Sequence, residues 1–369
     1  MLAALKGILF YEFYAYIKLM ITHSHHRWPG VPLALGAAIL FGISTPISKL
    51  LLTSISPWML AGILYLGAGF GLLFLRVIRG GNSKEASLQR GDIPWLAAVV
   101  VIGGVVGPVL LMTGLARTSA SQASLLLNLE GLATMGLAWL VFKESVDRRL
   151  LIGVFAILTG AVILTWNGRG FQFDSGSVFI VGACLAWGID NNLTRKISGA
   201  DPMQIATVKG LAAGAVNIGL ALFTGATWPS ASFVVIGALV GFACIGMSLV
   251  MFMLGLRHLG AARTGAYFTL APFVGAILSI TFLHEPLTLK LLISGLLMAV
   301  GLWLHLAEHH EHEHVHEELE HDHAHTHDAH HDHTHCGDAT EPHSHPHKHA
   351  PRKHKHAHYP DLHHPHVHE

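Results

Sequence analysis

Long apolar stretches between residues 31 and 306 limit, more than any other feature, what this chain can fold into. Each contains about 20 residues, the length that an α-helix needs to cross the hydrocarbon core of a bilayer. Charges, glycines and prolines separate ten such stretches, near residues 31–52, 57–76, 93–115, 119–142, 148–166, 176–195, 202–224, 231–256, 261–283 and 286–306. We therefore predict an all-α integral membrane protein with ten transmembrane helices.

The two halves of this region resemble one another in sequence. The aligned pairs are GAAILFGISTPISK (36–49) with GACLAWGIDNNLTR (182–195), LMTGL (111–115) with FMLGL (252–256), and KES (143–145) with HEP (284–286). Because each half contains five spans, an odd number, the second half must enter the membrane from the opposite side. We predict a five-plus-five inverted repeat, with a substrate site near the middle of the membrane between the halves.

The chain divides into four parts on this basis. Residues 1–30 are an interfacial segment, 31–168 the first repeat, 169–307 the second repeat and 308–369 a tail. Lys6, Glu12 and Lys18 interrupt the apolar N-terminal segment, so we interpret it as a membrane-surface helix, with an extra span or a misplaced start codon as alternatives.

Positive charge is distributed unevenly between the two sides of the predicted bundle. The segments on one side contain 14 Lys and Arg, and the loops on the other side contain four, Lys49, Arg117, Arg169 and Lys290. Since cytoplasmic loops carry the excess of basic residues, we expect both termini to be cytoplasmic and the protein to be a multi-pass protein of the inner (plasma) membrane.

Two segments are similar to those of a known family. LLLNLEGLATMGLAWLVFKES in the fourth span and YFTLAPFVGAILSITFLHEPL in the ninth resemble the EamA-type transporters of the drug/metabolite transporter superfamily. The resemblance covers residues 31–306 and implies a ten-helix bundle with a central cavity that usually exports small metabolites. The chain departs from the family in having Gly131 where the second half has Pro272, and in a second span without a basic residue, so the common substrates do not transfer automatically.

Charged residues deep within a span are costly and are functional candidates by default. Glu130 lies in the middle of the fourth span, one turn from Asn128, and either binds a cation or proton or makes a structural hydrogen bond. Asp190, Asn191 and Asn192 form a polar cluster in the sixth span. Its repeat counterpart contains Pro46, so a broken or kinked helix is expected in either half; the alternative is that Asp190 pairs with a basic residue at the interface.

Lys209 in the seventh span needs a buried partner, with Glu130 as first candidate and Asp190 as second. Such a pair favours an amphoteric cargo, such as an amino acid, over a divalent cation. Tyr65, Tyr267 and Trp187 are candidate cavity residues, although packing is the alternative role of aromatic residues. Gly103 and Gly107 exemplify small-residue spacings that allow close helix approach, within the bundle or in a homodimer.

The tail contains 24 of the 30 histidines. Imidazole binds Zn, Ni, Co and Cu(II) well; the candidate ligands are His310, His312, His314, His316, His321, His323, His325, His327, His331, His333, His335 and Cys336. The start of the tail is expected to continue the last helix for several turns, and the rest to be disordered in the absence of metal.

Three functions fit these observations. The first is export of a divalent transition metal, with the tail capturing or sensing the ion; the second is export of amino acids or other small metabolites, with the tail as a metal buffer or sensor; the third is a membrane anchor for a metal-binding tail. The cost of intramembrane charges favours transport, and the tail favours a metal-linked exporter. No P-loop motif is present, and we expect no enzyme activity, no required cofactor and no nucleic-acid partner. The expected partners are the lipid bilayer and a small-molecule or ion substrate.

Overall fold

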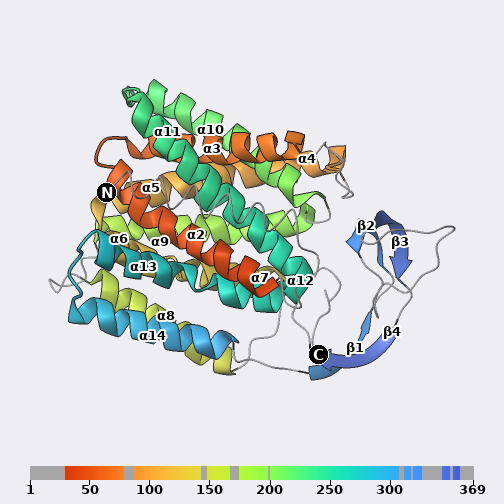
Figure 1. Ribbon diagram of the computed structural model, residues 1–369. Helices are drawn as coiled ribbons and strands as arrows, with labels where there is room; N and C mark the ends of the chain where they lie inside the picture. Colours follow the sequence, from red (N-terminus) through yellow and green to blue (C-terminus); the bar gives the residue numbers. More distant parts are fainter. Residues whose placement is uncertain are drawn as a thin grey trace.

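The computed structural model describes residues 30–78, 87–142, 148–166, 174–197 and 200–306 of the body, and the backbone of residues 311–316, 319–325, 343–349 and 352–357 of the tail (Figure 1). The predicted interfacial segment lies outside the described residues, apart from Gly30. The body described here is helical.

The first half begins with α2 (Gly30–Leu51) and α3 (Pro57–Ile78). A continuous helical segment follows, made of η1 (Arg90–Asp92), α4 (Ile93–Val99), η2 (Val100–Val106) and α5 (Gly107–Arg117). The half ends with α6 (Ala120–Leu126), α7 (Leu129–Phe142) and α8 (Arg148–Thr165). The second half contains α9 (Ser175–Thr194), η3 (Arg195–Ile197), α10 (Pro202–Phe223), α11 (Ala231–Val240), η4 (Gly241–Met247), α12 (Ser248–Phe268), α13 (Ala271–Phe282) and α14 (Leu289–Leu306). Pro57 and Pro202 each begin a helix, where a missing backbone N–H leaves no hydrogen bond unmade.

These helices lie in the ranges predicted as spans, to within a few residues. Among the described residues, five helical segments are long and apolar enough to cross a membrane by themselves: Gly30–Leu51, Pro57–Ile78, Arg90–Arg117, Pro202–Phe223 and Ala231–Gly255. The shorter apolar helices Leu151–Thr165, Ala271–Phe282 and Leu289–Leu304 occupy other predicted spans. A helical membrane body is thus confirmed, and the number of ten crossings stays a prediction.

Helix packing follows the sequence repeat. Helix α3 packs on α10 and α8 on α14, and each of these pairs joins corresponding elements of the two halves; α6 packs on α13, which joins the predicted fourth and ninth spans. Helix α2 packs on α12 and α13, just as α9 packs on α5 and α7. Exchanging the halves therefore leaves the packing pattern unchanged, and Figure 1 shows α8 with α14 on one side of the bundle and α3 with α10 on the other.

Interruptions of the helices occur at matching positions in the two halves, but at other positions than predicted. Helix α2 continues through Pro46, and α9 continues through residues 190–192. In α9 the Asn192 side chain donates to the Gly188 carbonyl of its own helix at 2.8 Å, so its polar group needs no helix break. The interruptions are instead the π-helices η2 and η4, and the turns at 127–128 and 269–270.

Helix α12 includes the junction between the predicted eighth and ninth spans. A Cβ atom on Gly255 would lie 3.0 Å from Thr264 Cγ2, whereas residues nine apart in a straight helix are separated by about 13.5 Å. The chain therefore reverses direction between these two residues, although its backbone keeps helical hydrogen bonds. The predicted end of one span and start of the next are consistent with this reversal.

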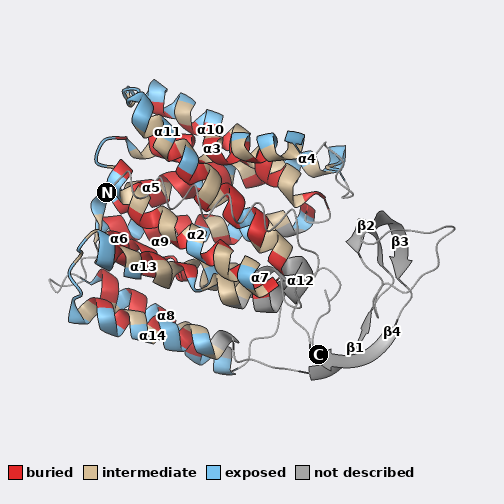
Figure 2. Cartoon of the chain, in the orientation of Figure 1, coloured by how far each residue is buried: buried red, intermediate tan, exposed pale blue. Residues whose placement is uncertain are grey.

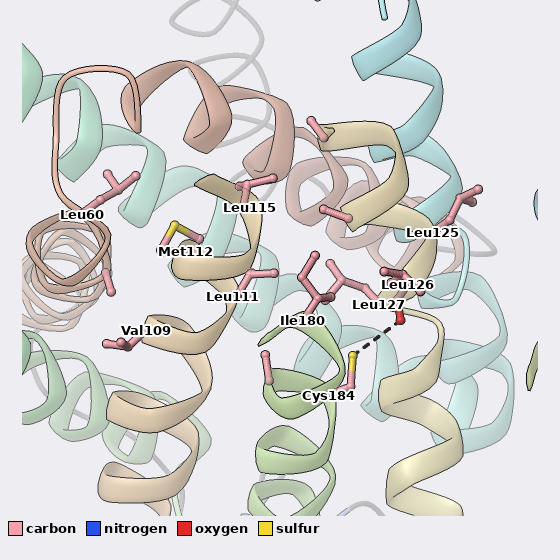
Figure 3. Close-up of a cluster of buried hydrophobic side chains, with 14 of the residues drawn as sticks. Leu60, Val109, Leu111, Met112, Leu115, Leu125, Leu126, Leu127, Ile180 and Cys184 are labelled. Atoms are coloured by element: carbon pink, nitrogen blue, oxygen red, sulfur yellow. Dashed lines mark hydrogen bonds between the residues drawn. The ribbon is translucent and has the colours of Figure 1, made fainter. Parts of the chain in front are cut away.

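Buried residues face the inside of the helix bundle and exposed residues lie mainly on its outside (Figure 2), where many of the exposed residues are large and apolar. Figure 3 shows part of the core, where Leu115, Leu126 and Ile180, from three different helices, are fully buried, with 0% of each exposed. In contrast, Phe155 on α8 is 70% exposed and Trp303 on α14 is 65% exposed. An apolar exterior of this extent is expected of a surface that faces lipid.

Glycines allow α3 and α10 to approach closely. A Cβ atom on Gly69 would lie 2.9 Å from the Gly210 carbonyl carbon, and one on Gly62 would lie 3.1 Å from the Gly214 carbonyl oxygen. The predicted close approach through small residues is therefore confirmed, inside the bundle.

The described parts of the tail correct the prediction of a helical start followed by disorder. Helix α14 ends at Leu306, and four strands follow: β1 (Glu311–His316), β2 (Leu319–His325), β3 (His343–His349) and β4 (Arg352–Ala357). Strand β1 pairs antiparallel with β4, and β2 with β3. Alternation of histidine with other residues has the two-residue period of a strand.

Candidate substrate site

A buried ion pair joins the two central helices of the second half. The Lys209 ammonium on α10 donates to Asp190 Oδ2 on α9 at 2.5 Å. Asp190 is 4% exposed. Lys209 therefore pairs with the second candidate from the sequence, not with Glu130, and the alternative that Asp190 caps the helix or pairs with Arg195 or Lys196 stays a prediction.

Glu130 is held separately, at the contact between α7 and α9. The Asn191 side-chain amide donates to Glu130 Oε1 and to Thr134 Oγ1, each at 3.1 Å. The Asn192 amide donates to the Thr134 carbonyl at 3.0 Å. Glu130 is the second residue of α7, where the positive end of the helix dipole favours an anion. The turn at 127–128 thus puts a carboxylate at a helix start inside the bundle.

The π-helix η2 offers its backbone carbonyls to side chains of three other helices. Tyr65 Oη on α3 and Trp187 Nε1 on α9 donate to the Gly103 carbonyl at 3.1 and 3.0 Å. Asn217 Nδ2 on α10 donates to the Gly104 carbonyl at 3.1 Å. The wider turn of a π-helix is frequent at functional sites, and here it places polar backbone groups beside the ion pair.

Glycine is needed at η2 because side chains of the cluster occupy the space of a Cβ atom. A Cβ on Gly103 would overlap the Asp190 carboxylate, and one on Gly107 would lie 2.6 Å from Trp187 Nε1. The small-residue spacing seen in the sequence therefore has a role in the site as well as in packing.

The predicted site residues are only partly assembled. The structure brings together Tyr65, Glu130, Asp190, Asn191, Asn192 and Lys209, with Trp187. Asn128, in the turn after α6, instead donates to the Leu125 carbonyl of that helix at 2.9 Å, and Tyr267 lies half-buried on α12, outside the hydrogen bonds that link the described cluster.

Sequence reasoning missed Thr134 and Asn217. Thr134 is four residues after Glu130 and Asn217 is eight after Lys209, so each shares a helix face with a charge that was identified. Their spacing from these charges was the feature of the sequence that could have identified them. Asn217 and Asp190 are both buried, and Oδ1 of each has no hydrogen-bond partner among the described residues.

Among the described residues, the charges of the polar cluster lie around η2 and not around η4, its counterpart in the other half. At the equivalent place in the other half, Gly241 of η4 packs against the backbone of Leu64 on α3, and Leu64 is the repeat counterpart of Lys209. The packing is thus common to both halves, while the charges are not. The fold itself does not require them.

Metal ligands do not gather in the described part of the body. It contains no group of three or more His, Cys, Asp or Glu residues that could hold a metal ion. Cys184 is buried and its thiol donates to the Leu126 carbonyl at 3.5 Å (Figure 3). Of the ligands predicted in the tail, His310, His327, His331, His333, His335 and Cys336 lie outside the described residues, and the others occupy β1 and β2.

Comparison with known proteins identifies relatives of the body. The EamA-like transporter family matches residues 28–166 and again residues 174–307. An uncharacterized transporter of Methanothermobacter thermautotrophicus is 31% identical over 285 residues, which cover 73% of this chain and 83% of the relative. A probable amino-acid metabolite efflux pump of Salmonella typhimurium is 24% identical over 298 residues, covering 74% of this chain and 93% of the relative.

A solved structure supports the same fold. Its description reads "Crystal structure of protein", and it aligns with 76% of this chain and 96% of its own length, with a TM-score of 0.57 and 17% sequence identity. At this identity the likeness concerns the arrangement of the helices.

Proposed function

Because the chain belongs to the EamA-like transporter family, we propose that it is a secondary transporter that exports amino acids or similar zwitterionic metabolites across the plasma membrane. The observation that carries this proposal is the buried ion pair between Lys209 and Asp190, beside η2. The Salmonella relative, named a probable amino-acid metabolite efflux pump, supports the same class of cargo.

The ion pair can bind both ends of a zwitterion. An ammonium group has three N–H donors, and one of those of Lys209 is bonded to Asp190, so others remain for a substrate carboxylate. Oδ1 of Asp190, which lacks a partner among the described residues, accepts a substrate amine. Each charge of the cargo thus meets an opposite charge, which offsets the cost of removing it from water.

The repeat supports a transport cycle in which the two halves alternate in opening. We propose ten crossings, five in each half, with the halves inverted and both termini cytoplasmic, as the basic residues predict. The packing pattern supports this because it stays unchanged when the halves are exchanged.

A divalent transition metal is the second candidate cargo, favoured by the 24 histidines of the tail. The Lys209 ammonium opposes it, because a cation next to Asp190 repels a second cation. We therefore assign the metal to the tail and propose that the tail buffers or senses Zn, Ni, Co or Cu. The strand register supports this, since His321 lies opposite His347 and His323 opposite His345, within the distance range of adjacent strands.

Export is tested in bacterial cells that lack their own amino-acid exporters and are loaded with labelled amino acids. Cells with the full chain are expected to release one or more of them faster, and Lys209→Met to slow this release about tenfold or more, as loss of a charged hydrogen bond implies. The matched control is Lys290→Met, a lysine at the start of α14 that donates to the Trp166 carbonyl, which is expected to export normally.

Three results would contradict the proposal in different ways. Equal release with and without the protein would exclude amino acids as cargo, and normal release by Lys209→Met would exclude the ion pair as the site. If the full chain lowers the cell content of one metal and Glu130→Gln abolishes this effect, the second candidate cargo is correct.

A further inference from the structure

The turn between α5 and α6, residues 115–121, is held at both of its ends by charged side chains. On one side the Lys49 ammonium, from the end of α2, donates to the carbonyls of Leu115 and Thr118 at 2.7 and 2.6 Å. On the other side the Glu285 carboxylate accepts from the backbone N–H groups of Ala120 and Ser121 at 2.7 and 2.8 Å.

These charges match the polarity of the backbone that they contact. The carbonyls at the end of α5 carry partial negative charge, and the N–H groups at the start of α6 carry partial positive charge. Ser119 already caps α6 by accepting from Gln122 N–H at 3.2 Å. Glu285 therefore adds a contact beyond the ordinary cap.

Of the two charged side chains that hold this turn, Glu285 joins the two halves, whereas Lys49 belongs to the same half as the turn. Lys49 and the α5–α6 turn belong to the first repeat, while Glu285 precedes α14 in the second. His284, the preceding residue, has a φ of 54°, a left-handed conformation that is uncommon for a residue other than glycine. The local sequence alone does not favour this conformation of His284, which directly precedes the residue that contacts Ala120 and Ser121.

We propose that Glu285 is a latch between the halves, which closes the outer end of the bundle and must release Ala120 and Ser121 when that end opens. The outer assignment follows from the charge distribution of the loops, which puts Lys49 on the outer side. Opening requires the halves to separate there, and the hydrogen bonds of Glu285 cross the boundary that separates.

The sequence repeat contains the same pair of charges for the other end. Lys49 aligns with Arg195 and Glu285 with Glu144, and the turn aligns with residues 256–262. Glu144, and the side chains of Arg195 and of residues 256–262, lie outside the described residues.

This proposal rests on the proposed transport function but is tested without a cargo. The probe is the rate at which a membrane-impermeant methanethiosulfonate reagent, added outside intact cells, labels a cysteine at Thr134→Cys. The full chain is used, with Cys184, Cys244 and Cys336 replaced by serine. Glu285→Gln and Glu285→Ala are expected to raise the labelling rate about three- to thirty-fold, the range of a lost helix-terminal hydrogen bond.

Asp174→Asn is the matched control. Asp174 also caps a helix, accepting from Ser177 N–H and Ser177 Oγ at 3.0 Å each, but these side-chain contacts stay within the second half. An unchanged rate in both Glu285 variants, or an equal rise in Asp174→Asn, would overturn the latch. Size-exclusion chromatography identifies any variant that has lost its fold, in which case the other Glu285 variant carries the test. If amino acids prove not to be the cargo, the labelling result still stands.

Discussion

At the scale of single residues, the decisive feature is that the buried Asp190 carboxylate pairs with the partly buried Lys209, while Glu130 is bound by the neutral amide of Asn191. Taking a charge out of water is expensive, and only a close partner of opposite charge compensates for it. The ion pair therefore holds α9 and α10 together, but its two charges cost free energy of desolvation. Leu64, the repeat counterpart of Lys209, is apolar and avoids this cost. A cost of this kind is expected at a site under functional constraint.

Removing one partner of this pair is expected to be worse than removing both. Lys209→Met or Asp190→Leu alone leaves an uncompensated buried charge and should lower the free energy of unfolding by about 3–5 kcal/mol. The double variant removes both charges and should recover most of this loss.

Thermal unfolding of the three variants in one detergent measures the difference. Additive losses in the double variant would contradict a direct interaction between the two side chains.

At the scale of elements, the two π-helices and the two mid-span turns shape the site. They recur at equivalent positions, η2 with η4 and 127–128 with 269–270, so the duplication includes the irregular parts of the helices. Among the described residues, η2 of the first half contacts the charged side chains of Asp190 and Lys209. The same distortion thus serves packing in one half and the site in the other.

Gly103→Ala is expected to disturb the site because its methyl group would overlap the Asp190 carboxylate. We expect a loss of stability of about 1–3 kcal/mol from overpacking, together with loss of export. Gly219→Ala in α10 is the control, since a Cβ there meets nothing within 4 Å, and should be neutral or stabilise by about 0.5–1 kcal/mol.

Unfolding in detergent and release of labelled amino acids check both variants. Equal effects of the two substitutions would contradict the role assigned to η2.

At the scale of the whole molecule, the body and the tail are expected to act separately. A chain ending at Ala307 should export amino acids at the rate of the full chain but bind no more metal than its few remaining histidines allow. The full chain should bind Zn or Ni at pH 7 and release it near pH 5, because imidazole, with an ordinary pKa of about 6.5, then becomes cationic.

Equilibrium dialysis of the purified protein, with and without the tail, measures this binding. Equal metal binding by both chains would contradict the assignment of the metal to the tail, and loss of export on truncation would show that body and tail depend on each other.

The sequence by itself determined the helical membrane body, the helix ranges, the duplication and the family, because the length of an apolar stretch and the period of a repeat are local properties. It also identified most charged members of the cluster, since a charge in an apolar span is conspicuous. The partner of Lys209, the π-helices that bring Gly103 to Asp190, and the contact of Glu285 with Ala120 were decided only by the tertiary structure. These features depend on which helix faces meet, and packing over the whole bundle pairs Lys209 with Asp190, which the sequence placed second to Glu130.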